Sequence, residues 1–118
     1  MAQVHTTTLL ADHKGVSRPK VCGDEYVVDA VVDVTSHLAS GAIIPASDFG
    51  LSTIHCATIC GTEGANAHVP SLLTTATGGY TSSSSIALMF TALDGTNATV
   101  ANDGNPACAV RLRVWGNL

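Results

Sequence analysis

Four cysteines and five histidines are the residues of this sequence whose side chains could support catalysis or metal binding. They are Cys22, Cys56, Cys60, Cys108, His5, His13, His37, His55 and His68. The histidines are dispersed, without the paired spacing of a zinc protease or of a structural zinc site. The sequence also has no phosphate-binding glycine loop and no serine nucleophile elbow. We therefore expect no metal, no cofactor and no enzymatic activity, although a cysteine and a histidine could still pair in space.

The segment that holds Cys56 and Cys60 decides between the interpretations of the cysteines. Residues 52–60 predict a strand, because β-branched Thr and Ile residues dominate them. Four residues along a strand separate two Cα atoms by about 13 Å, whereas a disulfide requires about 4.4–6.8 Å. The same separation keeps both thiolates from one zinc ion, and His55 should face away from Cys56. We expect small buried hydrophobic cysteines; a metal site would require this segment to be helical.

Alternation with a period of two residues places the other side chains, since helical periodicity hardly occurs in the sequence. The expected strands are residues 26–35, 53–60, 85–92 and 108–115, with 4–10 and 96–101 as shorter candidates. In the first strand, Tyr26, Val28, Ala30, Val32 and Val34 should face inward, and Asp29 and Asp33 should face solvent. Residues 85–92 are apolar on both faces, which predicts a strand that is central or packed against a partner.

The last strand and the turns complete the predicted fold. Cys108, Val110, Leu112 and Val114 should face inward, and Arg111, Arg113 and Trp115 should share the outward face. Turn residues separate the strands, and a short helical turn could begin at Ser47 or Asp48. The predicted fold class is all-β, a single-domain antiparallel β-sandwich (jelly-roll-like) or small barrel with little helix.

The composition indicates a domain that buries part of its surface in contact with other molecules. The chain has 118 residues, enough for one domain, and 46% of them are hydrophobic. Charged residues make up only 12%, whereas an ordinary soluble domain has about 25%. This balance excludes intrinsic disorder, which requires low hydrophobicity and high net charge.

The placement of charge excludes two classes of partner. All five basic residues lie near one end of the chain or the other: Lys14, Arg18, Lys20, Arg111 and Arg113. So few basic residues cannot form a nucleic-acid surface, and no apolar run approaches the roughly 20 residues of a membrane helix. The first residues do not have the pattern of a secretory signal. We therefore expect neither nucleic acid nor membrane as a partner, and folding in the cytoplasm.

Four short motifs resemble small structural proteins of tailed bacteriophages. They are residues 31–35 (VVDVT), 48–54 (DFGLSTI), 91–96 (TALDGT) and 110–117 (VRLRVWGN), and the resemblance spans about residues 26–118. It implies a capsid cement or decoration protein, a homotrimer that binds the major capsid protein on the outer surface of the virion head. The particle would assemble in the host cytoplasm.

The candidate binding residues lie at the two ends of the chain. We expect residues 1–20 to form an extended N-terminal arm and residues 21–118 to form the β-sandwich domain. The candidate partner-binding residues are Lys14, Arg18 and Lys20, which would meet acidic residues of the shell, together with Trp115. The alternative for the arm is a frayed terminus.

Two other functions remain open at this stage. A tail-fibre or carbohydrate-binding β-domain would stack exposed aromatic residues such as Trp115 on sugars, and residues 74–85 could be a hairpin tip or a contact loop that presents Tyr80. A small hydrolase or metalloprotein would instead use cysteine and histidine.

Overall fold

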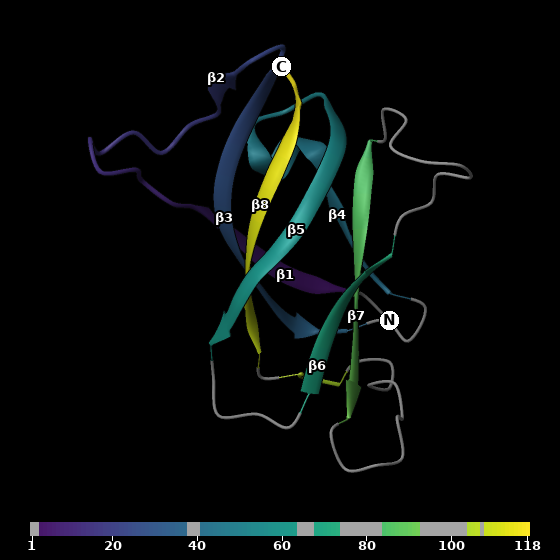
Figure 1. Cartoon of the computed structure of the whole chain (residues 1–118). Helices are drawn as coiled ribbons and strands as arrows, with labels where there is room; N and C mark the ends of the chain where they lie inside the picture. Colours follow the sequence, from purple (N-terminus) through teal and green to yellow (C-terminus); the bar gives the residue numbers. More distant parts are fainter. Residues whose placement is uncertain (1–2, 38–40, 64–67, 74–83, 93–103, 107) are drawn as a thin grey trace.

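The computed structural model describes residues 3–37, 41–63, 68–73, 84–92, 104–106 and 108–118. These residues form eight strands and one short 3-10 helix (Figure 1). The elements are β1 (Val4–Leu9), β2 (Lys20–Cys22), β3 (Glu25–Ser36), β4 (Ala42–Pro45), η1 (Ala46–Phe49), β5 (Thr53–Glu63), β6 (His68–Leu73), β7 (Ser85–Ala92) and β8 (Ala109–Asn117). The predicted all-β fold class is confirmed, with two antiparallel sheets in one globule.

The larger sheet has five strands in the order β1-β3-β8-β5, and β2 pairs with the first residues of β3. Strand β3 alternates as the sequence predicts: Val28, Ala30, Val32 and Val34 are buried, and Asp33 on the other face is exposed. Strand β8 does the same, with Val110, Leu112 and Val114 buried. Because β3 and β8 are neighbours, their outward residues also form one continuous face.

The smaller sheet has three strands in the order β4-β7-β6. Strand β7 lies between the other two, so of the two predictions for residues 85–92 the central strand is confirmed. In Figure 1, β3, β8 and β5 run side by side, with β6 and β7 beside them. The sequence analysis did not predict β2, β4 or β6, which are short and which in two cases contain a proline.

One hydrophobic core joins the two sheets. Its residues come from β3, β8 and β5 on one side and from β4 and β7 on the other, and η1 adds the fully buried Phe49. The 3-10 helix begins at Ala46, close to the helical turn expected at Ser47 or Asp48. Gly50 follows it with a φ of 77°, a left-handed conformation that glycine adopts at little cost.

The boundary expected at residue 20 does not separate an arm from a sheet. Val4–Leu9 form β1, which pairs along its whole length with β3, as the shorter candidate strand over residues 4–10 predicts. Only the segment between β1 and β2 leaves the sheet. The prediction of an arm over residues 1–20 was therefore wrong for β1, since this strand pairs with β3 and belongs to the larger sheet. The strand expected at 96–101 and the loop residue Tyr80 lie outside the described residues.

Candidate functional site

A pocket of about 300 Å³ lies where the segment between β1 and β2 passes the outward face of β3 and β8. We call it the β3–β8 pocket. The two strands place its floor in register, because Val27 lies opposite Trp115 and Asp29 lies opposite Arg113. Lys20 of β2 lies opposite Val27 on the other side. Residues that are up to 105 positions apart in the chain, Leu10 and Trp115, therefore line one pocket.

The segment that forms the outer wall is held by Asp12. One oxygen of this carboxylate accepts hydrogen bonds from the backbone N–H groups of Lys14 (2.8 Å) and Val16 (2.9 Å). The other accepts from Nζ of Lys20 at 2.8 Å. Gly15 closes the turn with a φ of 82° and a backbone bond to Asp12. The hydrogen bond from Lys20, followed by that from Val16, holds the pKa of Asp12 far below its usual range, so the carboxylate is charged at neutral pH.

The floor of the pocket carries a second ion pair. The guanidinium of Arg113 donates from Nε to Oδ1 of Asp29 at 2.7 Å and from Nη2 to Oδ2 at 3.0 Å. This two-point geometry fixes the plane of the guanidinium as well as its position. The hydrogen bond from Arg113 lowers the pKa of Asp29, and the same contact raises the pKa of Arg113.

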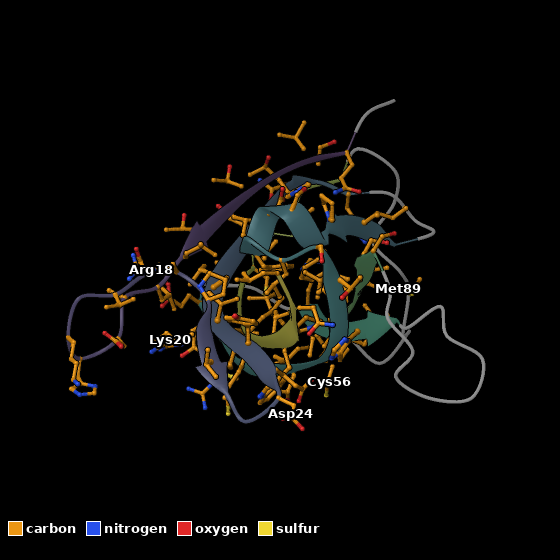
Figure 2. All side chains as sticks on the ribbon, turned by 90° about the horizontal axis from the view of Figure 1, so that it is seen from above. Arg18, Lys20, Asp24, Cys56 and Met89 are labelled. Atoms are coloured by element: carbon orange, nitrogen blue, oxygen red, sulfur yellow. The ribbon has the colours of Figure 1, made fainter. Side chains whose placement is uncertain are left out.

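Among the described residues, Arg18 is the cation of the pocket that has no counter-ion. Lys20 is paired with Asp12 and Arg113 with Asp29, whereas Arg18 makes no hydrogen bond or ion pair with the described residues. Figure 2 shows Arg18 and Lys20 on the same side of the molecule. Three cations and two carboxylates line the pocket together with the half-buried indole of Trp115, so the described lining has an excess of one positive charge.

Three of the four predicted binding residues come together here. Arg18, Lys20 and Trp115 line the pocket, whereas Lys14 does not; its backbone lies in the turn around Asp12. The sequence analysis missed Asp12 and the pairing of Asp29 with Arg113. The second could have been found, because both residues occupy outward positions of strands predicted to be long enough to pair, but the register was not known.

Two of the four cysteines contradict the prediction that they are buried. Cys108 is buried, but Cys22 and Cys60 are exposed and Cys56 is half-buried, and all four are free thiols. The prediction of small buried hydrophobic residues was therefore wrong for Cys22 and Cys60. Strand β5 has irregular pairing between Ile54 and Cys56 and again between Ile59 and Gly61, and this shifts the alternation on which the prediction depended.

The first irregularity also changes the position of His55. Its Nδ1 lies 2.8 Å from Oε2 of Glu25, and its Nε2 lies 3.2 Å from Nδ2 of Asn117. By register, Glu25 and Asn117 lie on the same face of the sheet as Trp115. Cys56 pairs with Trp115 across the strands and lies on this face as well. His55 was thus wrongly expected on the other face from Cys56. Within the described ranges, no group of three or more His, Cys, Asp or Glu residues could hold a metal ion.

Comparisons with known proteins give no relative. No protein-family model, no curated protein and no solved structure matches the chain. In the part of the chain that the structure describes, no helix is long and apolar enough to cross a membrane.

Proposed function

We propose that this protein is a structural component of a virion, a capsid decoration protein that binds the outer surface of a tailed-phage head. It would stabilise contacts between major capsid subunits without a chemical reaction. The β3–β8 pocket is the observation that supports a binding function best, because it joins an unpaired arginine to a half-buried tryptophan. The short motifs that resemble phage structural proteins support the choice of partner.

The pocket has the chemistry of a protein–protein contact. Tryptophan and arginine are the residues most enriched at energetic centres of interfaces, and lysine is depleted there. An acidic side chain of a capsid subunit would compensate the charge of Arg18, while Trp115 would provide apolar contact area. The ion pairs of Lys20 and Arg113 hold the walls in place before the partner arrives, which lowers the entropy cost of binding.

Repeated copies would make a modest single contact sufficient. A stable interface buries about 1,200–2,000 Å² in total, and one small domain has little surface to offer. A cyclic homotrimer that binds several capsid subunits at once would gain affinity from the linked contacts. Separating the capsid subunits would then also require breaking those contacts, which stabilises the shell.

A carbohydrate-binding domain, such as that of a tail fibre, is the second candidate. The specific observation in its favour is that Trp115 lines one pocket together with the polar side chains of Asp29 and Arg113. Sugars bind by stacking on an indole and by hydrogen bonding to carboxylates and guanidinium groups. This candidate differs from the first because it does not need the unpaired charge of Arg18.

Variants of the pocket test the proposal on purified heads that lack the protein. Arg18→Glu and Trp115→Ala should each weaken binding to the heads by roughly 30-fold, the effect of removing a central interface residue. Lys14→Glu is the matched control: it reverses a charge four residues away, outside the pocket, and should bind like the wild type.

Three results would contradict decoration of the shell through this pocket. They are an absence of wild-type binding to the heads, equal binding of Arg18→Glu and wild type, and loss of binding with Lys14→Glu alone. Specific binding on a glycan array that Trp115→Ala abolishes and Arg18→Glu preserves would favour the carbohydrate candidate instead.

A further inference from the structure

His5 of β1 is held between a side-chain amide and a carboxylate. Its Nδ1 lies 2.7 Å from Nε2 of Gln3, and its Nε2 lies 2.8 Å from Oδ2 of Asp48 in η1. The same amide of Gln3 binds the backbone of Ile43 in β4: Nε2 donates to the carbonyl and Oε1 accepts from the N–H, each at 2.7 Å. The imidazole, the amide and the edge of β4 therefore form one chain of hydrogen bonds.

The backbone of Ile43 determines which way round the amide lies. A carbonyl can only accept and an N–H can only donate, so Gln3 has to present Nε2 to the first and Oε1 to the second. Nε2 then also points an N–H at Nδ1 of His5, and this ring nitrogen has to accept it. The arrangement is complete only while the imidazole of His5 is neutral, with its proton on Nε2.

Protonation of His5 would place two donors against each other. An imidazolium carries an N–H on both nitrogens, so Nδ1 could no longer accept from Gln3. Asp48 holds the ring in both states, because Oδ2 accepts from Nε2–H whether or not the imidazole is charged. The conflict therefore falls on Gln3. Whether its amide moves away or turns over, both bonds to Ile43 are lost, because a turned amide points oxygen at the carbonyl and nitrogen at the N–H.

The surroundings of His5 leave its own charge as the one that mild acid changes. Histidine is the side chain that ordinarily changes charge between about pH 5 and pH 8, and this one is 19% exposed, so protons reach it from solvent. Asp48 is the charged group that faces it among the described residues. On β3 the residue opposite is apolar and buried, and Asp33 lies on the outer face. Strand β4 has no titratable side chain, and His37 after β3 packs edge to face on Phe90.

We propose that His5 is an acid-sensitive latch, whose protonation releases Gln3 from β4 and opens the contact between the two sheets at the start of β1. At neutral pH the amide covers the N–H and the carbonyl of Ile43. An edge strand without such cover is open to pairing with another chain. Mild acid should therefore expose the edge of β4 while β1 stays paired with β3. The latch does not depend on the partner proposed for the β3–β8 pocket.

His55 provides an internal comparison, because it has the same two kinds of neighbour without the same consequence. Its Nδ1 lies 2.8 Å from Oε2 of Glu25, and its Nε2 lies 3.2 Å from Nδ2 of Asn117. The side-chain amide of Asn117 has no further hydrogen bond among the described residues. It can therefore turn over and offer Oδ1 to a protonated His55 without giving up another partner. Protonation should change the structure at His5 and not at His55.

Amide hydrogen exchange of the full-length chain, followed by NMR between about pH 8 and about pH 5, tests the proposal. The protection of the Ile43 N–H, corrected for the intrinsic effect of pH on exchange, should fall at least about tenfold on acidification. The N–H of Ile44 is the control in the same strand, because successive N–H groups point to opposite sides and this one points toward β7. Its protection should change little. Equal losses at Ile43 and Ile44 would mean opening of the whole sheet and would overturn the latch.

Three variants separate His5 from the other titrating groups. His5→Asn cannot be protonated, so its Ile43 protection should no longer depend on pH, and Gln3→Ala should leave Ile43 unprotected at every pH. His55→Asn is the matched control and should keep the pH dependence of the wild type. The proposal is overturned by constant Ile43 protection in the wild type, by a protected Ile43 in Gln3→Ala, by retained pH dependence in His5→Asn, or by its loss in His55→Asn.

The wild type alone gives a second measurement that does not rely on a variant that folds. The NMR signals of the Gln3 side-chain amide and of the Ile43 N–H should shift with the same pH midpoint as the imidazole of His5. Signals of Gln3 that do not shift, or that follow the midpoint of His55 instead, would also overturn the latch.

Discussion

The side chain of Gln3 binds the backbone of Ile43 as a neighbouring strand would. Its Nε2 donates to the Ile43 carbonyl and its Oε1 accepts from the Ile43 N–H, each at 2.7 Å. Gln3 directly precedes β1 of the larger sheet, whereas Ile43 belongs to β4 of the smaller sheet. The amide therefore connects the two sheets and satisfies a free sheet edge that would otherwise be open.

The next inward residues of β1 extend this connection. Nε2 of Gln3 also lies 2.7 Å from Nδ1 of His5, and Nε2 of His5 lies 2.8 Å from Oδ2 of Asp48 in η1. Since Gln3 donates to Nδ1, the neutral imidazole carries its proton on Nε2 and donates to Asp48. Thr7 donates to the same carboxylate oxygen at 3.1 Å. The N-terminal segment thus closes one side of the domain.

We predict that Gln3→Ala lowers the free energy of unfolding by about 1–2 kcal/mol, because it removes the two hydrogen bonds to Ile43 and the one to His5 and leaves the edge of β4 to solvent. Urea denaturation followed by tryptophan fluorescence measures the effect. Thr6→Ala is the control, since Thr6 is an exposed residue of the adjoining strand β1 with no side-chain hydrogen bond among the described residues. Equal stability of Gln3→Ala and Thr6→Ala would show that the amide does not hold the sheets together.

We predict that Gly116→Ala is the most damaging single methyl group that can be added to the larger sheet. A Cβ at this position would overlap the backbone carbonyl of Thr53 on β5, which cannot move without breaking the pairing of β5 with β8. The loss should be about 3 kcal/mol, at the upper end for an overpacked site. Thermal and urea denaturation both measure it.

Gly61→Ala provides the matched comparison on β5. A Cβ at Gly61 meets nothing within 4 Å, so this variant should change the stability by less than about 0.5 kcal/mol. Equal stability of the two glycine variants would contradict the close approach of Gly116 on β8 to the backbone of Thr53.

The sequence predicted well where one physical rule acts alone. The alternation in β3 and β8 is set by burial of one face of each strand. The apolar character of β7 on both faces goes with its central position. Both features could therefore be predicted from the local sequence pattern. The exposure of Cys60 could not, because it depends on irregular pairing of β5 next to Gly61. The pocket was predicted only in part. Outward positions could be assigned, but the pairing of Asp29 with Arg113 depends on a register that joins residues 84 positions apart.

Because of the ion pair between Asp29 and Arg113, the free energy of unfolding should change with pH in the acid range. Arg113 lowers the pKa of Asp29 in the folded protein below the value of about 3.9 in an unfolded chain. The unfolded state therefore binds the proton more readily, and the stabilisation is complete above about pH 4 and is lost as the pH falls through the folded pKa. Asp29→Asn should be less stable than the wild type at pH 7, and the difference should shrink as the pH falls through the folded pKa of Asp29.

The size of this effect should be modest, because the pair is partly exposed. The side chains of Arg113 and Asp29 are 50% and 25% exposed, which points to less than about 1 kcal/mol at low salt and less at high salt. Asp33→Asn is the control, since Asp33 is exposed on the same face and forms no ion pair with the described residues. A stability difference between Asp29→Asn and wild type that persisted unchanged at pH 2 would exclude the ion pair as its cause.

The four thiols should react in an order set by their exposure. Cys22 and Cys60 are exposed and should be alkylated first, Cys56 more slowly, and Cys108, which is 1% exposed, only when the domain unfolds. For a domain of ordinary stability, the rate at Cys108 should be lower by roughly a thousandfold or more. Maleimide labelling with mass spectrometry of the peptides measures each site.

Because Cys22 lines the β3–β8 pocket and Cys60 does not, a partner bound in the pocket should slow the labelling of Cys22 more than that of Cys60. Labelling of Cys108 as fast as Cys22 would contradict the described core, and equal protection of Cys22 and Cys60 would place the partner elsewhere on the sheet.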